Sequence, residues 1–297
     1  MVVSTKLCFG QSDSSSFFHS SKEFNKNRFV GLISSEAIVF TGSMIGLGQL
    51  WYSDYEKSSF HFINDNRSWL QMDKVGHFAS AYYLTSIGAN LFKWTGTNNG
   101  KSVFWGAQFG MLFLTSIEIL DGFSENWGAS SGDIIANFGG GLFSIAQSLA
   151  WKEQRVLCKF SFHTTSYSKY RPELLGDRVV ENIFKDYNGQ SYWLSINVAS
   201  FMKGESRFPK WLNIAVGYGA EGMLGASENP SAIDGEVIPH FDRYRKVLFS
   251  FDVDLSRIKT KSPVLKCLFK TFSIFKIPFP ALEYNKLNGV IVHPIYL

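Results

Sequence analysis

Cysteine is scarce in this chain and follows no pattern. The 297 residues contain three cysteines, Cys8, Cys158 and Cys267, which are far apart and odd in number. This spacing excludes a disulfide framework and a zinc site built on thiolates. Charged residues are also few, at 18%, and the net charge of +4 comes mainly from residues 241–297, which hold ten Lys and Arg against four Asp and Glu. That basic end favours an anionic surface, and because it carries no nucleic-acid motif we expect no nucleic-acid partner.

The first residues, MVVSTKLCFGQSDSSS, resemble the back half of a secretion signal. A short apolar stretch is followed by small residues and then by serines, which is the order found around a cleavage site. A basic start and a long apolar core are missing, so the pattern indicates a signal that begins upstream of Met1. Cys8 follows Thr-Lys-Leu rather than a small residue, and we expect no lipid on it. Residues 1–28 are interpreted as a signal remnant and polar leader.

Four long apolar stretches dominate the next part of the chain. Each approaches the ~20 residues that cross a bilayer core as a helix, and tryptophans stand at several of their ends, as interfacial anchors do. Gly42 and Gly46, and then Gly106 and Gly110, have the spacing that lets helices approach closely. Two interpretations stay open, a membrane-type bundle and a buried bundle of a soluble domain. The four stretches are Phe29–Tyr52, Phe78–Trp94, Val103–Leu120 and Ile134–Trp151.

Basic residues gather at one end of the four expected helices. The positive-inside rule places this end in the cytoplasm, whereas a cleaved signal requires the opposite orientation, so both topologies stay open. The basic residues are Lys22, Lys26, Arg28, Lys93, Lys101, Lys152 and Arg155.

The last part of the chain changes to the alternation of apolar and polar residues that is typical of strands. Strands are expected within residues 192–202, 210–224, 245–255 and 288–297. Ser262 and Pro263 form a good helix start, and the lysines of this helix share one face. It is therefore either a basic amphipathic helix suited to a membrane surface or a core helix with a solvated lysine stripe.

The predicted fold class is α+β. A four-helix membrane-type bundle over residues 29–155 is followed by a small antiparallel β-rich region over residues 156–297, which contains the one basic amphipathic helix.

Polar residues recur where three of the apolar stretches begin or end. In an up-and-down bundle these points lie at the same end, and residues three or four apart share one face of a helix. Glu36 lies nearer the opposite end and is not included. The spacing therefore predicts a cluster of six side chains from three helices, with Lys74 and Ser130 beside them: Asp73, His77, Glu118, Asp121, Asp133 and Asn137.

Such a cluster needs a counter-charge, because an unpaired buried charge costs several kcal/mol. Lys74, a protonated His77, a metal ion or a cationic ligand would supply it. Neighbouring carboxylates also raise the pKa of each other and of a histidine, which is how acid and base catalysts are tuned. The alternative is a hydrogen-bonded network that fixes helix register. The spacing is not a known metal signature, so metal and cofactor stay open, and no nucleophile elbow surrounds Ser130. The candidates are His77, Glu118, Asp121 and Asp133 for acid–base catalysis and Asp73, Lys74, Ser130 and Asn137 for ligand binding.

The combined motifs Asp-Lys-x-x-His, Glu-x-x-Asp-Gly, Trp-Gly-x-Ser-x-Gly-Asp and Asn-x-x-Gly resemble those of the YfiM-like family of bacterial envelope proteins, described as predicted periplasmic lipoproteins with a domain of unknown function. More distantly, the order is similar to that of VanZ-like membrane proteins, although the arginine usual before their final aspartate is absent. The resemblance covers roughly residues 30–150 and implies an envelope location and a helical core, without an activity. It is carried by Asp73, Lys74, His77, Glu118, Asp121, Gly122, Trp127, Gly128, Ser130, Gly132, Asp133, Asn137 and Gly140.

The sequence thus predicts a membrane-associated protein of the bacterial cell envelope, in the inner membrane or on the periplasmic side of the outer membrane. Its first expected function is binding or scaffolding of an envelope lipid, a lipid-linked glycan or a cation through the polar cluster, so the expected partner is a membrane lipid or lipid-linked molecule. The alternative is an acid–base or metal-assisted hydrolase of an envelope substrate, and a purely structural cluster is a third reading. Enzymatic activity, substrate and oligomeric state stay open.

Overall fold

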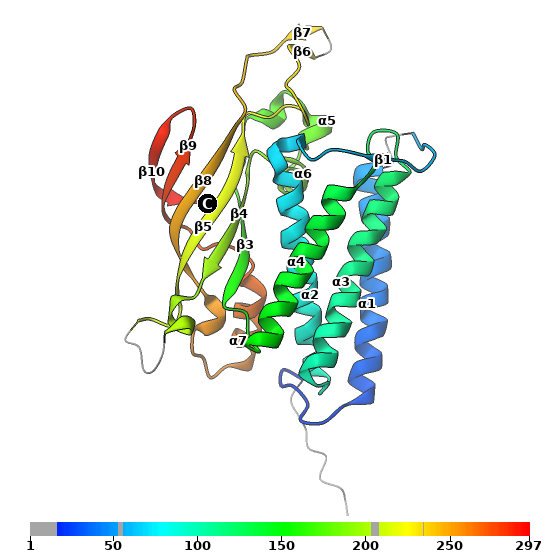
Figure 1. The fold of residues 1–297 in the computed structure, drawn as a ribbon, viewed down its shortest axis with the longest axis vertical. Helices are drawn as coiled ribbons and strands as arrows, with labels where there is room; N and C mark the ends of the chain where they lie inside the picture. Colours follow the sequence, from blue (N-terminus) through cyan, green and yellow to red (C-terminus); the bar gives the residue numbers. More distant parts are fainter. Residues whose placement is uncertain (1–16, 53–55, 203–207, 234) are drawn as a thin grey trace, which may run out of the picture.

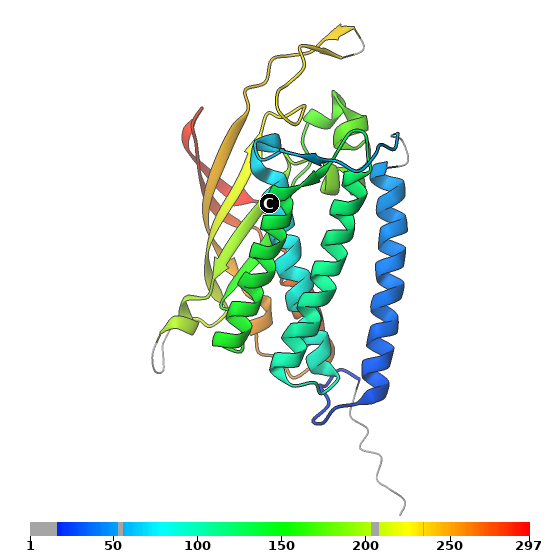
Figure 2. The ribbon, with the colours of Figure 1, turned by 45° about the vertical axis from the view of Figure 1, so that its right-hand side comes forward.

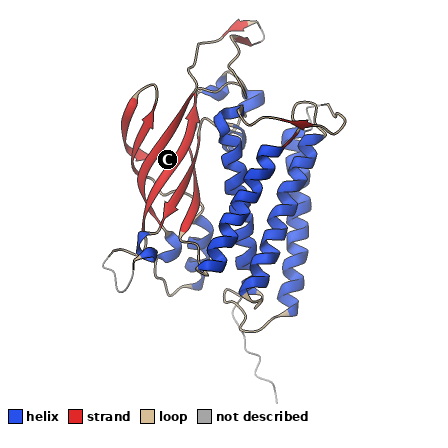
Figure 3. Ribbon diagram, viewed as in Figure 1, coloured by secondary structure: helices blue, strands red, loops and turns tan. Residues whose placement is uncertain are grey.

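The computed structural model describes residues 17–52, 56–202, 208–233 and 235–297. Helices make up the first half of the chain and a large antiparallel sheet dominates the second half (Figure 3). The α+β class predicted from the sequence is confirmed. The expected signal segment and Cys8 lie outside the described residues.

Four long helices form the first layer. Asn25, Asn98 and Ser130 each begin a helix by accepting a hydrogen bond from the backbone N–H three residues on, which satisfies one of the unpaired donors of the first turn. The helices are α1 (Lys26–Leu47), α2 (Met72–Trp94), α3 (Asn99–Gly122) and α4 (Ser131–Ala150).

The helix α2 is the centre of this layer and packs closely against α3 and α4. A Cβ on Gly106 would lie 2.3 Å from the backbone nitrogen of Ala89, and a Cβ on Gly140 would lie 1.9 Å from the carbonyl oxygen of Phe78. By contrast, nothing lies within 4 Å of a Cβ on Gly42 or Gly46, and Leu32 is the buried residue of α1. Three helices therefore pack tightly, and α1 lies at their outer side (Figure 2). A membrane-type bundle in which all four helices pack equally closely stays a prediction.

The second layer is a six-stranded antiparallel sheet in the order β10-β9-β8-β5-β4-β3. The four predicted strands correspond to β4, β5, β8 and β10, whereas β3 and β9 were not predicted. Figure 1 shows the strands running beside the helices along the long axis of the molecule. The strands are β3 (Val156–Phe162), β4 (Gln190–Ile196), β5 (Leu212–Glu221), β8 (Tyr244–Val253), β9 (Phe279–Asn285) and β10 (Gly289–Tyr296).

This sheet is strongly curled. Strands β4 and β10 are four positions apart in it, about 19 Å on a flat sheet with a strand spacing of about 4.8 Å. Nevertheless the hydroxyl oxygens of Ser191 in β4 and Tyr296 in β10 are 3.0 Å apart. The outer edge of β3 is also paired, because Phe160 exchanges backbone hydrogen bonds with Ile274 and Lys276. The curl therefore has an inner face, and an outer face that α2 covers at β3 and β4 through Tyr82 and Cys158.

Short elements connect the two layers. The predicted basic helix is α7 (Pro263–Phe272), and its cap is the hydroxyl of Ser262, which accepts a hydrogen bond from the N–H of Leu265. None of its residues is buried, and its role as a basic amphipathic helix at a membrane surface stays a prediction. The remaining elements are α5 (Pro172–Leu175), α6 (Val179–Lys185), β1 (Phe62–Ile63), β2 (Ala129–Ser130), β6 (Ala232–Ile233), β7 (Glu236–Val237), a π-turn (Gly48–Tyr52) and 3₁₀ turns at Ser68–Gln71, Tyr167–Lys169, Val198–Phe201 and Leu255–Arg257.

Candidate functional site

The polar cluster predicted from the sequence forms where α2 begins, α3 ends and α4 begins. Lys74 is its centre of positive charge. The ammonium group lies 2.5 Å from Asp65, 2.9 Å from Asp133 and 3.1 Å from Asp73. These side chains are between 6% and 20% exposed, so the ion pairs are only weakly screened by solvent.

Asp65 was not predicted as a member of the cluster. It lies in the segment between β1 and α2, which has no helical periodicity to place it. The two-residue strand β1 pairs with β2, and this pairing holds Asp65 against the start of α4. Its second oxygen accepts a hydrogen bond of 2.5 Å from the hydroxyl of Ser130.

His77 lies between two groups of oxygen atoms. Its Nδ1 is 3.1 Å from Oδ1 of Asn137 and 3.5 Å from Oε1 of Glu118. Its Nε2 faces Oδ1 of Asp73 at 3.7 Å and Oδ1 of Asp133 at 4.0 Å. Oδ1 of Asn137 is within hydrogen-bonding reach of the ring, whereas Oε1 of Glu118 and the two oxygens that face Nε2 are too distant for a normal hydrogen bond.

Glu118 and Ser130 join α3 to the start of α4. The N–H of Ser130 donates to Oε2 of Glu118 at 3.1 Å, and the hydroxyl of Ser130 accepts from the N–H of Asp133 at 3.2 Å. Ser130 therefore acts here as a helix cap and as a bridge to Asp65. Oε1 of Glu118 is buried and accepts no hydrogen bond within the described chain.

Two tyrosines complete the surroundings, and neither was predicted. Tyr187, which precedes β4, donates a hydrogen bond of 2.7 Å to Oδ1 of Asp73. Tyr52, after α1, donates one of 2.6 Å to Oδ1 of Asp121. Asp121 thus lies at the margin of the cluster, bound to the end of α1. A tyrosine more than a hundred residues from Asp73 gives no sequence signal of this contact.

The charges of the cluster shift the pKa values of its members in opposite directions. Burial raises the pKa of Asp73, but His77 and Lys74 outweigh it and hold that pKa below its usual value. Burial lowers the pKa of His77, but Asp73, Asp133 and Glu118 outweigh it and raise that pKa. Burial and the charge of Asp73 raise the pKa of Asp133 to about 6. Asp73 is therefore the ionised partner of His77, whereas the raised pKa of Asp133 lets a proton bind that carboxylate near pH 6.

The start of α2 is held in place by the end of the sheet. Trp69, Leu70 and Gln71 have left-handed backbone angles, with φ of 49°, 50° and 68°, which cost about 1–3 kcal/mol each for residues other than glycine. The N–H of Trp69 donates to the carbonyl of Ala226 at 2.6 Å, Tyr218 donates to the carbonyl of Leu70, and Arg245 donates to Gln71 at 2.6 Å. These contacts with the sheet and its loops offset the strain directly before Asp73.

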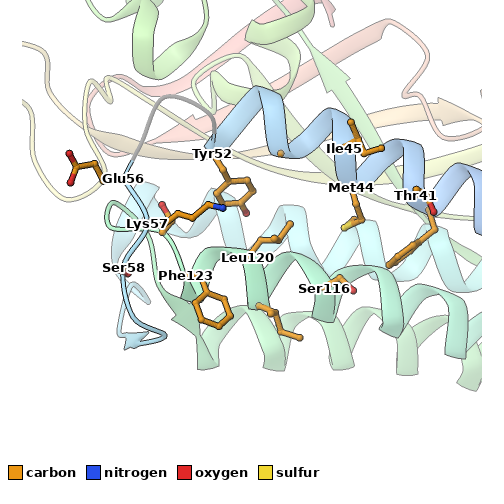
Figure 4. Close-up of a pocket in the computed structure, with 14 residues that line it drawn as sticks. Thr41, Met44, Ile45, Tyr52, Glu56, Lys57, Ser58, Ser116, Leu120 and Phe123 are labelled. Carbon is orange, nitrogen blue, oxygen red and sulfur yellow. The ribbon is translucent and has the colours of Figure 1, made fainter.

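A cleft of about 950 Å³ lies between α1 and α3, next to the cluster (Figure 4). Apolar side chains line most of it, and Tyr52 with its bonded Asp121 separates one end of it from the cluster. Polar residues from the segment after the π-turn surround that end. The lining includes Phe40, Thr41, Met44, Ile45, Tyr52, Glu56, Lys57, Ser58, Ser116, Leu120 and Phe123.

One group of atoms in the cluster has the geometry of a metal site. One ligand atom each from Asp73, His77 and Asp133 lie within 4.8 Å of one another. Two carboxylates and an imidazole are ligands of first-row divalent metals such as Zn²⁺ and Mn²⁺. The Nδ1 side of His77 meets oxygen atoms, which is how a metal-binding histidine is usually oriented.

Comparison with known families finds a match for the segment that contains α2, α3 and most of α4. Residues 61–148 match the model of a family described as predicted periplasmic lipoprotein (DUF2279). Residues 61–148 are therefore similar to that family. The DUF2279 segment contains all eight predicted site residues, whereas α1, Tyr187 and the six-stranded sheet lie outside it. Its description indicates an envelope-associated location, without distinguishing the inner from the outer membrane, and it names no activity.

Comparisons with curated proteins and with solved structures identify no related protein. No curated protein and no solved structure matches the chain, and the more distant resemblance of the DUF2279 segment to VanZ-like proteins has no support. Within the described residues, α1 and α3 have the length and composition of membrane spans. A transmembrane topology therefore rests on these two helices, one of them near the N-terminus.

Proposed function

We propose that this protein is a membrane-associated envelope protein whose polar cluster binds a divalent cation through Asp73, His77 and Asp133. The observation that carries the proposal is the direction in which His77 faces. Oδ1 of Asn137 can only accept a hydrogen bond, so the hydrogen of a neutral His77 is on Nδ1. The lone pair of Nε2 then points toward two carboxylate oxygens at 3.7 and 4.0 Å. Three electron-rich atoms that face one another in this way repel, and either a proton on Nε2, which the raised pKa of His77 favours, or a bound cation removes that repulsion.

The charge balance also supports a cation. Five carboxylates, those of Asp65, Asp73, Glu118, Asp121 and Asp133, surround one lysine and one histidine. Lys74 already faces three of them, so its charge is shared, and Glu118 retains a buried oxygen without a donor. Carboxylates in excess of their counter-charges are costly in a low-dielectric site. A bound cation, or protons at low pH, offsets that excess.

The ligand types favour a first-row transition metal over Ca²⁺ or Mg²⁺. Imidazole suits Zn²⁺ or Mn²⁺, whereas Ca²⁺ and Mg²⁺ take oxygen ligands in larger numbers. Asn137 and Glu118 would orient His77 from its Nδ1 side, and Tyr187 would orient Asp73. Loss of such supporting groups typically weakens metal binding by about 10–100-fold.

The acid–base hydrolase is the less supported alternative. In that reading Lys74 stabilises negative charge that develops on the substrate. Its ammonium group instead lies within 3.1 Å of three carboxylates, which hold it and neutralise its charge.

A lipid or lipid-linked partner is also part of the proposal, because the α1–α3 cleft next to the cluster is mainly apolar.

Metal binding by the purified protein tests the proposal. The full chain in detergent is stripped with a chelator, titrated with Zn²⁺ or Mn²⁺ by calorimetry, and compared with two single variants. Asp133→Asn removes a proposed ligand, and we expect its affinity to fall at least tenfold. Asp121→Asn is the matched control, since it removes a carboxylate of the same cluster that binds Tyr52, and we expect its affinity to change little. Equal affinities of wild type and Asp133→Asn, with both proteins folded, would refute the site.

A further inference from the structure

The curled sheet has its apolar side chains on the outside. Register places one residue of each strand from β4 to β10 in a single row on the outer face: Leu194, Val216, Phe249, Leu282 and Val292. Beyond the part of this outer face that α2 covers, the side chains are exposed. Ile214, Phe249, Phe251, Leu282, Val290 and Val292 are between 43% and 69% exposed.

The inner face holds the buried charges, beside a small apolar cluster of Trp193, Ala215, Leu248, Ala281 and Tyr296. Lys159 and Asp252 form an ion pair of 2.6 Å, and both side chains are 0% exposed. Lys246, also buried, pairs with Glu221 at 2.6 Å, and its side chain lies across Gly219, where a Cβ would come within 2.8 Å of Cε. The glycines of β5 thus make room for large side chains inside the curl, Gly219 for Lys246 and Gly217 for the ring of Trp193.

Buried ion pairs inside the curl and exposed apolar side chains outside it differ from the usual arrangement of a sheet in water. An antiparallel sheet in a soluble protein packs its apolar face on the core and solvates its polar face, whereas strands in a membrane alternate apolar-out and polar-in. The apolar outer face continues from the area that α2 buries onto β5, β8, β9 and β10, where the described chain provides no cover. Exposed apolar patches of this extent mark an interaction surface.

The helices beside the sheet indicate what covers it. Helices α1 and α3 have the composition and length of membrane spans, about 33–36 Å at 1.5 Å per residue, close to the ~30 Å hydrocarbon core. Both views show the long strands β5 and β8 running alongside the helices over a similar height (Figures 1 and 2). A bilayer that surrounds α1 and α3 therefore also meets the outer face of the sheet.

Charge at one end of the molecule fits the same placement. The end of the helices away from the cluster carries Arg28, which lies over the ring of Trp94 at 4.7 Å, and Arg155, over the ring of Trp151 at 5.0 Å. The lysines of α7 extend this basic end, because Lys270 lies close enough to Lys93 for the two charges to interact. Tryptophan and arginine together are typical of the headgroup region, and basic clusters attract anionic lipids.

We propose that the outer face of the six-stranded sheet is a lipid-contacting surface, with acyl chains against β5, β8, β9 and β10 and anionic headgroups at the basic end. The bilayer replaces the protein layer that would cover this face in a soluble fold. The proposal does not depend on cation binding by the cluster, since it concerns the opposite layer of the molecule.

Spin labels on single cysteines test this surface. Cys8 and Cys267 are replaced by serine, the buried Cys158 is kept, and a cysteine is introduced by Phe249→Cys or Val292→Cys. Val237→Cys, in the exposed hairpin of β6 and β7, serves as the aqueous control, and Ile38→Cys on α1 as the helix comparison. The full chain is reconstituted in vesicles of phosphatidylethanolamine and phosphatidylglycerol, and collision rates with oxygen and with a water-soluble nickel chelate are measured.

Lipid contact requires a collision ratio of oxygen to nickel chelate severalfold higher at positions 249 and 292 than at position 237, because oxygen concentrates in hydrocarbon and the chelate is excluded from it. A ratio at 249 and 292 equal to that at 237 would place the sheet in water and overturn the proposal. Low collision rates with both reagents would mean that a second copy or another protein covers the face, which overturns it as well.

Discussion

The substitution Lys74→Met distinguishes two hypotheses for the polar cluster, a cation-binding site and a network that fixes helix register. The two hypotheses differ in whether added metal restores the stability of the variant. In the protein without metal, the change leaves Asp65, Asp73 and Asp133 without the ammonium that lies 2.5–3.1 Å from them. Breaking a fully buried pair costs about 3–5 kcal/mol, and these side chains are partly exposed. We therefore expect the free energy of unfolding to fall by about 2–3 kcal/mol.

The same substitution should strengthen cation binding. A metal about 2 Å from the Asp133 carboxylate lies roughly 4–5 Å from the lysine nitrogen, and a divalent and a single charge at that separation repel by roughly 7 kcal/mol at an effective dielectric of about 20. Even a fifth of that repulsion, about 1.4 kcal/mol, is a tenfold change in dissociation constant. We expect Lys74→Met to bind Zn²⁺ or Mn²⁺ at least tenfold more tightly than wild type.

Thermal unfolding in detergent, with and without metal, measures both effects. Metal at about 100 times its dissociation constant adds about 2.7 kcal/mol, enough to restore most of the stability lost by Lys74→Met. Lys93→Met, at the other end of α2, is the matched control and should show neither effect. A Lys74→Met protein that is destabilised and that metal does not rescue would refute the cation site and favour a network that fixes helix register.

Three further results follow from the geometry. Gly140→Ala should lower the free energy of unfolding by about 1–3 kcal/mol, because its Cβ would lie 1.9 Å from a backbone oxygen. Gly139→Ala is the control for the same unfolding assay. It should be near neutral, because the nearest atoms to its Cβ are those of a ring at 3.3 Å. Cation affinity should fall as pH drops, first because His77, whose pKa is raised above its usual 6.5, takes up a proton, and further below about pH 6, where Asp133 does so. Each competing proton lowers the affinity by up to about tenfold per pH unit, and calorimetry that finds no change between about pH 7 and pH 5 would contradict this. Lys159→Met should cost about 3–5 kcal/mol in denaturant unfolding, and Lys159→Met combined with Asp252→Leu much less, because a lone buried charge is costlier than none.

The helices and the core of the cluster were predictable because they depend on local periodicity. Apolar runs predicted the helices α2, α3 and α4. A spacing of three or four residues predicted that Asp73 and His77 share one face of α2, and the order of the helices predicted that this face meets the end of α3 and the start of α4. The close approach at Gly106 followed from the Gly-x-x-x-Gly motif, whereas the same motif in α1 packs against nothing in the described chain. A motif gives the possibility of close contact, and only the tertiary arrangement decides which copy is used.

The contributions of distant segments could not be predicted. Asp65 reaches the cluster through a two-residue strand, and Tyr187 reaches it across the interface between the layers. The strand β3 was missed because its alternation covers only residues 158–162, and the two residues before them, Val156 and Leu157, are both apolar. Polarity also gave no indication of which face of the sheet lies outside, because alternation is the same whichever face is buried.

The three residues with left-handed backbone angles before α2 affect whether a shorter fragment of this protein can keep the geometry of the polar cluster. A fragment cut at residues 61 and 148 keeps every ligand of the proposed cation site, yet it loses the sheet contacts that offset the strain at Trp69, Leu70 and Gln71, and it loses Tyr187. Released from the sheet, this turn would relax and the first turn of α2, with Asp73, would move away from His77's other partners. We therefore expect that residues 61–148 alone would not hold the proposed ligands in place, because the six-stranded sheet supports the start of α2.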